Sequence, residues 1–119
     1  MADPRSQYRI VAELPVDFLW RYRQLDRWHQ PRNSAKFRSL VADIAVRGVQ
    51  EPLRLRYDAE KALVVNGNHR LAVAVRLGIR SLPVSLEPEL SDWPHADARP
   101  LSAEDLGRLV TICQADSLL

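Results

Sequence analysis

Four consecutive residues, at a predicted junction between a strand and a helix, have the side chains and spacing best suited to chemistry. They are Gly67, Asn68, His69 and Arg70. Where a strand turns through glycine into a helix, the first backbone N–H groups have no partner within the helix. The helix dipole adds positive potential at the same place, and the side chains of His69 and Arg70 supply further donors. This pattern predicts a binding site for an anion such as phosphate.

The same residues also fit an ordinary helix start. In that interpretation Gly67 makes a tight turn, Asn68 caps the helix and Arg70 lies on the surface. His69 would then be a structural, partly buried histidine. Taken alone, the four residues leave both interpretations open.

Hydropathy periodicity indicates the elements that must position this turn. Alternation predicts strands, and a spacing of three and four residues predicts helices. The predicted strands are 8–14, 53–57, 62–65 and 82–86, with residues 58–61 as a hairpin turn. The predicted helices are 17–28, 34–47, 71–77 and one that starts at 102. Prolines at 88, 94 and 100 indicate an arm between the last strand and the last helix.

Two of these helices have patterns that predict how they pack. The second has one apolar stripe made of Phe37, Leu40, Val41, Ile44 and Ala45. The third is apolar on nearly all sides, so we expect it to be buried. Gly48 and Gly78 follow these helices and are predicted to end them. Ser102 resembles the cap of the last helix, whose stripe includes Leu109 and Cys113.

Two motifs in this order carry a family resemblance. The first, GVQEPLRL at residues 48–55, closes a helix into a strand, and the second, GNHRLAVA at residues 67–74, opens a helix. Together they resemble the ParB/sulfiredoxin superfamily over residues 8–86. The resemblance implies an α+β fold: one domain with a small mixed sheet flanked by helices. Residues 87–119 would be a proline-containing arm with a C-terminal helical appendage.

The resemblance also implies a nucleotide pocket formed by the two motifs. Gly67, His69 and Arg70 match the turn that holds phosphate, and Asn68 lies within it. Gln50 and Pro52 match the opposite wall, with Gln50 and Glu51 as its polar groups. The implied ligand is CTP or ATP/ADP, with magnesium as a possible companion. Glu51 is the nearest candidate for a catalytic base, although a surface glutamate before proline is the simpler interpretation.

Two departures from the family narrow these expectations. Sulfiredoxins have a catalytic cysteine in the turn where this sequence has Asn68, and the single cysteine here is Cys113. We therefore expect no thiol chemistry. ParB partition proteins continue into a helix-turn-helix domain and a dimerisation domain, which these 119 residues do not include. Sequence-specific DNA binding by that route is not expected.

Charge suggests a second type of ligand. The net charge is +2, but residues 1–86 hold 15 Lys/Arg against 8 Asp/Glu, and residues 87–119 hold 2 against 7. The candidate nucleic-acid contacts lie in the basic excess and are Arg21, Arg23, Arg27, Arg32 and Lys36. A solvated helix face explains the same pattern. Aromatic residues among these arginines could stack bases, but their helical spacing favours core packing for Tyr22 and Trp28.

Composition sets the remaining expectations. An apolar fraction of 46% and a charged fraction of 27% are typical of a globular protein. We expect no membrane span, no structural metal and a cytoplasmic location, with a homodimer possible. Three function classes follow: a nucleotide-binding regulatory or DNA-associated accessory protein, an enzyme of the same fold (NTPase, small-molecule kinase or nuclease), and a non-specific nucleic-acid-binding module.

Overall fold

The fold is an α+β arrangement of one five-stranded sheet and four helices in the described part of the chain. The computed structural model describes residues 10–24, 35–89 and 98–117, with side chains up to Cys113. In chain order the elements are β1 (Ile10–Pro15), α1 (Val16–Arg21), α2 (Ala35–Arg47), β2 (Leu53–Tyr57), β3 (Lys61–Asn66), α3 (Asn68–Leu77), β4 (Ser81–Pro88), β5 (Arg99–Pro100) and α4 (Ala103–Ser117). The predicted sheet, its flanking helices and the C-terminal helix are therefore confirmed.

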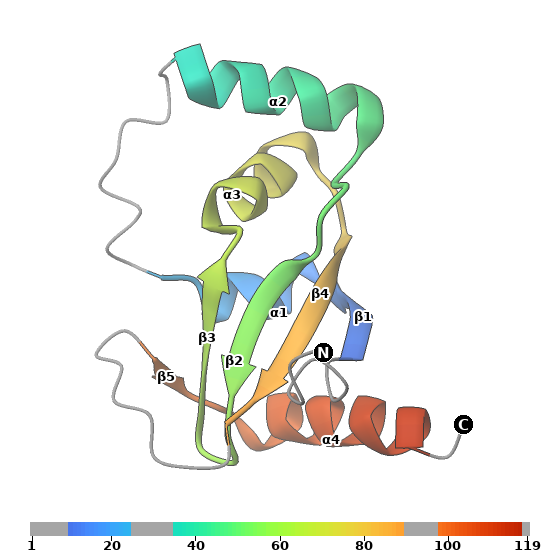
Figure 1. Ribbon diagram of the computed structural model, residues 1–119. Helices are drawn as coiled ribbons and strands as arrows, with labels where there is room; N and C mark the ends of the chain where they lie inside the picture. Colours follow the sequence, from blue (N-terminus) through green and yellow to red (C-terminus); the bar gives the residue numbers. More distant parts are fainter. Residues whose placement is uncertain (1–9, 25–34, 90–97, 118–119) are drawn as a thin grey trace, which may run out of the picture.

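The sheet is mixed, and its centre is a parallel pair. The strand order is β1-β4-β2-β3-β5, in which β2 and β4 run parallel and the other neighbours run antiparallel. A parallel pair needs a crossover, and here the hairpin partner β3 and helix α3 provide it. Figure 1 shows that α3 begins directly at the end of β3. The turn at residues 67–70 therefore lies at one end of the central strands.

One face of the sheet forms the main core. Alternate residues of the four long strands point to this face, and all of Leu14, Leu53, Leu55, Val64, Val84 and Leu86 are fully buried. They pack with Phe18 and Leu19 of α1, Leu71 and Ala74 of α3, and Leu109 of α4. A second, smaller cluster joins Phe37 and Ile44 of α2 to Ala72 and Val73 of α3. Helix α2 thus lies on α3, as Figure 1 shows.

The first helix is shorter than predicted. Periodicity indicated a helix over 17–28, but α1 ends at Arg21, and Leu25 and Trp28 lie outside the described residues. The carbonyl of Tyr22 accepts a hydrogen bond from the Val64 N–H at 2.8 Å, so the chain leaves the helix to join β3. Tyr22 itself is 3% exposed, which confirms its predicted place in the core.

Burial was overestimated at three positions. Ala45, predicted within the apolar stripe of α2, is exposed. Val75 and Leu77 of α3 are also exposed, although the helix was expected to be buried on nearly all sides. Residues 71–74 of α3 are buried against the two core clusters, whereas residues 75–78, at its C-terminal end, are exposed. An apolar sequence therefore overstated how much of this helix is enclosed.

The buried carboxylate of Asp105 connects helix α4 to the C-terminal end of α1 by hydrogen bonds. Ser102 caps α4, since its Oγ accepts the Asp105 N–H at 3.1 Å. The Asp105 side chain is buried and accepts two bonds from Arg21, at 2.6 and 3.0 Å, and one from the Tyr22 hydroxyl at 2.5 Å. Burial alone would raise the pKa of Asp105, but these hydrogen bonds outweigh it and hold the pKa below its ordinary value of 3.8.

Asp105→Asn is expected to lower the free energy of unfolding at pH 7 by about 2 kcal/mol, because charge-assisted hydrogen bonds are lost. A carboxyl whose pKa is lower in the folded state stabilises it above the ordinary pKa, and this contribution disappears as pH falls through the folded-state pKa. The difference between variant and wild type, measured by urea denaturation, should therefore shrink below pH 3.8. The exposed neighbour Glu104→Gln is the control, and a difference that persisted in full at the lowest pH where the protein stays folded would contradict this assignment.

Candidate phosphate-binding site

The turn before α3 has the geometry that the sequence predicted. Gly67 is the N-cap of α3, with φ +98° and ψ 15°, and makes no side-chain capping bond. The Leu71 N–H donates to the Gly67 carbonyl at 2.9 Å, which begins the helical pattern. The N–H groups of residues 68–70 precede this bond and have no acceptor within the helix. These donors and the positive end of the helix dipole meet at one place.

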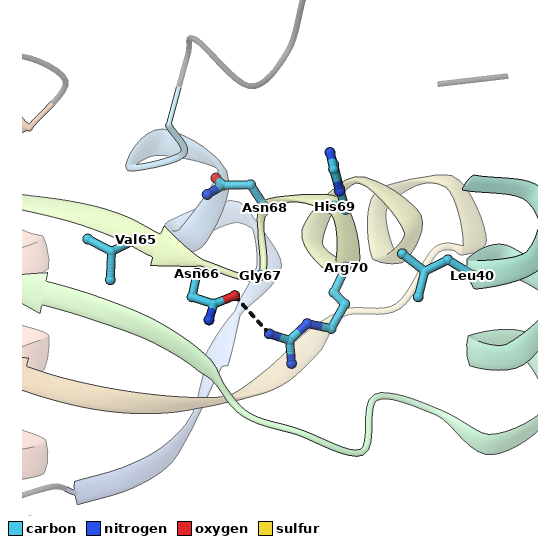
Figure 2. A pocket seen from close by; sticks show the side chains of 7 residues that line it. All are labelled: Leu40, Val65, Asn66, Gly67, Asn68, His69 and Arg70. Carbon is cyan, nitrogen blue, oxygen red and sulfur yellow. Dashed lines mark hydrogen bonds between the residues drawn. The ribbon is translucent and has the colours of Figure 1, made fainter. Parts of the chain in front are cut away.

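A pocket of about 470 Å³ opens at this turn. Its described lining comes from three elements: Leu40 of α2, Val65 and Asn66 of β3, and the four residues 67–70. Figure 2 shows Leu40 facing the start of α3 from the neighbouring helix, with His69 and Arg70 between them. The volume is within the range of pockets that bind small molecules.

Arg70 links the two predicted motifs. Its Nη1 donates to the carbonyl of Glu51 and, at 3.5 Å, to that of Pro52, while its Nη2 donates to Asn66 Oδ1 at 3.4 Å. Burial lowers the pKa of Arg70, and the nearby Glu51 carboxylate partly offsets this effect. The guanidinium therefore fixes the 51–52 segment against the turn, in addition to placing positive charge beside the pocket.

Asn68 has a structural role that the sequence did not suggest. Its side chain is buried, accepts the Gln24 N–H at 2.9 Å and donates to the Val64 carbonyl at 3.0 Å. The alternative that Asn68 caps the helix is wrong, because Gly67 is the N-cap and Asn68 is already helical. Its side chain joins Gln24, in the segment after α1, to Val64 of β3, which leaves its backbone N–H as the group suited to a ligand.

Of the other residues predicted for the pocket, only His69 is part of its described lining. His69 is exposed and lines the pocket. Gln50 and Glu51 are exposed and Pro52 is half-buried, and these three described residues are not part of the lining. Gln50 donates to the Arg47 carbonyl at the end of α2. The first motif thus contributes through the carbonyls that hold Arg70, and the candidate base Glu51 lies outside the described lining.

The structure describes three of the five candidate nucleic-acid residues, Arg21, Arg23 and Lys36. Arg21 is paired with Asp105, and its charge is therefore largely neutralised. Arg23 lies over the ring of Trp20, 4.2 Å from its centroid, and donates to the Trp20 carbonyl. Lys36 is exposed on α2, whereas Arg27 and Arg32 lie outside the described residues. The sequence could not show that the acidic C-terminal segment reaches back to Arg21.

Three residues that line the pocket were not predicted to do so: Leu40, which also packs against the α2–α3 cluster as its stripe predicted, Val65 and Asn66. Val65 was interpreted as the end of the predicted strand 62–65, Asn66 was given no role, and Leu40 was assigned to the apolar stripe of α2. Asn66 had one available signal, a polar side chain directly before the glycine at the end of an apolar strand. The position of Leu40 depends on how α2 crosses α3, which periodicity does not encode.

Comparison with known proteins identifies the fold. No protein-family model and no curated protein matches the chain in sequence. Among solved structures, sulfiredoxin from Arabidopsis thaliana matches with a TM-score of 0.56 and 22% identity, over 67% of this chain and 86% of the other. The chain has a ParB/sulfiredoxin-like fold. This confirms the fold expected from the two motifs.

The ParB/sulfiredoxin-like fold is also seen in a second match. The C-terminally truncated chromosome-partitioning protein ParB from Caulobacter crescentus, complexed with CTP-gamma-S, aligns with a TM-score of 0.53 and 19% identity. The alignment covers 90% of this chain but 53% of that one, so the chain spans about half of the ParB structure.

Two kinds of feature are absent from the described residues. They contain no group of three or more His, Cys, Asp or Glu side chains placed to hold a metal ion. Nor do they include a helix of the length and hydropathy needed to cross a membrane.

Gly67 is constrained both by its left-handed backbone conformation and by its close approach to Leu53. Three glycine-to-alanine variants separate the free-energy costs of these two constraints. A Cβ there would lie 2.5 Å from Leu53 Cγ in a left-handed backbone conformation, so Gly67→Ala is expected to cost about 2–4 kcal/mol of unfolding free energy. Gly48 has φ +72° and open space, so Gly48→Ala should cost only the backbone strain, about 1–2 kcal/mol. Gly107→Ala, within α4 and in open space, should be neutral or stabilising. Equal losses for Gly67→Ala and Gly48→Ala in urea denaturation would show that the Leu53 contact is unimportant.

Proposed function

We propose that this protein binds a nucleotide through its phosphate groups in the pocket at the start of α3. The observation that carries the proposal is the uncapped first turn of α3 opening into a 470 Å³ pocket. Backbone N–H groups at a helix N-terminus bind phosphate oxygens well, because they are already oriented toward the ligand. The ligand needs many acceptor oxygens, since the polar groups of this turn are mainly donors.

Each polar residue of the turn has a distinct part in this proposal. The N–H groups of residues 68–70 bind phosphate oxygens directly. His69, exposed at the rim, supplies a further donor. Arg70 contributes positive charge and holds the carbonyls of residues 51 and 52, so it keeps the pocket wall in place. Phosphate capture of this kind uses ground-state interactions and requires no catalytic base.

The choice of nucleotide is supported by the comparison with ParB. That ParB structure contains CTP-gamma-S, which makes CTP the first ligand to test, followed by ATP, ADP and GTP with magnesium. Because Glu51, the candidate catalytic base, is not part of the described lining, we favour a regulatory or DNA-associated accessory protein over an enzyme. Isothermal titration calorimetry with these four nucleotides tests the proposal, and it fails if none of them binds.

Arg70→Ala should weaken nucleotide binding about 10- to 100-fold, which corresponds to the loss of one charge-assisted hydrogen bond or more. Arg70→Lys keeps the charge but cannot bridge the two carbonyls and Asn66 at once, so its affinity should be intermediate. Both variants should be compared by calorimetry at one salt concentration, with thermal denaturation to show that they remain folded.

Arg76→Ala is the matched control for this measurement. Arg76 is exposed on the last turn of the same helix, roughly 9 Å farther along its axis. Its removal should leave the affinity within about twofold, because it does not line the pocket. An equal loss in Arg70→Ala and Arg76→Ala would indicate a general effect of positive charge and would contradict a site at the turn.

A further inference from the structure

The end of β3 is irregular where it meets the pocket. In its pairing with β2, Arg54 lies opposite Asn66 and Leu55 lies opposite Val64, so Val65 is an extra residue in the ladder. In a regular strand, consecutive side chains point to opposite faces. A bulge changes this alternation, and here Val65 and Asn66 both line the pocket. Bulges often redirect a side chain beside a functional site.

The orientation of the Asn66 amide follows from its contact with Arg70. Arg70 Nη2 lies 3.4 Å from Asn66 Oδ1, as the dashed line in Figure 2 shows. A guanidinium has only donors, so the oxygen of the amide must be the atom that faces it. The Asn66 NH₂ group therefore points away from Arg70. The choice between the two amide orientations, often ambiguous, is fixed here by chemistry.

The Arg70 guanidinium that orients this amide is itself held in place by other hydrogen bonds. Its guanidinium is half-buried and is also bonded to the carbonyls of Glu51 and Pro52. Asn66 is exposed, so its NH₂ group is accessible to a molecule entering the pocket. A side chain held at one end and exposed at the other is preorganised to donate a hydrogen bond.

We propose that Asn66 is a recognition residue of the pocket, donating from its side-chain NH₂ group to an acceptor oxygen of the bound nucleotide. This inference rests on the proposed function and adds a side chain to it that the two sequence motifs do not contain. The acceptor is either an oxygen of the phosphate chain or an oxygen of the sugar or base. Both sources share the same chemistry, and the experiment distinguishes them.

Two variants of Asn66 test the proposal by calorimetry with CTP and with ATP. Asn66→Ala removes the donor and should weaken binding about 10-fold. Asn66→Asp keeps an oxygen on Arg70, now as an ion pair, but replaces the donor with a charged acceptor. It should weaken binding by more than about 30-fold while the melting temperature stays equal or rises.

Two further measurements complete the test: the salt dependence of the affinity lost in Asn66→Asp, and the binding of parts of the nucleotide. If the carboxylate introduced by Asn66→Asp acted only by long-range repulsion, its effect would largely disappear at about 0.5 M salt, where such charges are screened, and the inference would be overturned. Inorganic tripolyphosphate and the free nucleoside separate the two acceptor sources. Asn66→Ala weakens tripolyphosphate binding if the acceptor is on the phosphate chain, and leaves it unchanged if the acceptor is on the sugar or base.

Failure of the inference is distinguishable from failure of the proposed function. If the wild-type protein binds a nucleotide and both Asn66 variants bind it equally well, Asn66 has no recognition role. If the wild-type protein binds none of the nucleotides, the proposed function fails and the role of Asn66 fails with it. A loss of affinity that matches a loss of melting temperature in both variants would assign Asn66 a purely structural role and overturn the inference.

Discussion

The structure around the pocket depends on the close approach of the Gly67 backbone to Leu53. Strand β3 can pass into α3 beside β2 only because residue 67 has no side chain, and the left-handed conformation of Gly67 starts the helix without a capping side chain. The free N–H groups of the first turn, the position of Arg70 and the end of β3 all follow from this contact. A steric constraint in the core thus determines where the first turn of α3, the proposed phosphate site, lies.

A set of hydrogen bonds made by residues 22–24 connects this turn to the C-terminal helix. Tyr22 accepts the Val64 N–H through its carbonyl and donates to Asp105 through its hydroxyl, and Gln24 donates to Asn68. Residues from α1, β3, α3 and α4 are therefore connected through one short segment. Since Asp105 also pairs with Arg21, the C-terminal helix is bound to the predicted basic region instead of lying apart from it.

Much of the fold and part of the site could be predicted from sequence because they depend on local patterns. Alternation identified β2, helical spacing identified α2, and glycine placed the ends of α2 and α3. The turn at residues 67–70 could be chosen as the candidate phosphate site because its glycine, its histidine and its arginine are close together in sequence. Local patterns failed where contacts between distant parts of the chain decide the outcome. Helix α1 ends before Tyr22, whose carbonyl bonds to β3, and Val75 is exposed although the hydropathy of α3 indicated burial.

The sequence by itself determined the α+β class, the order of the elements other than β5, and the turn at residues 67–70, since these depend on periodicity and on glycine conformation. Only the tertiary structure decided that Arg70 holds the carbonyls of residues 51 and 52, that Asn68 points to Gln24, and that Asn66 lines the pocket. The physical reason is that a side chain's partners are set by the crossing of elements and by a bulge in one strand, which no local pattern specifies.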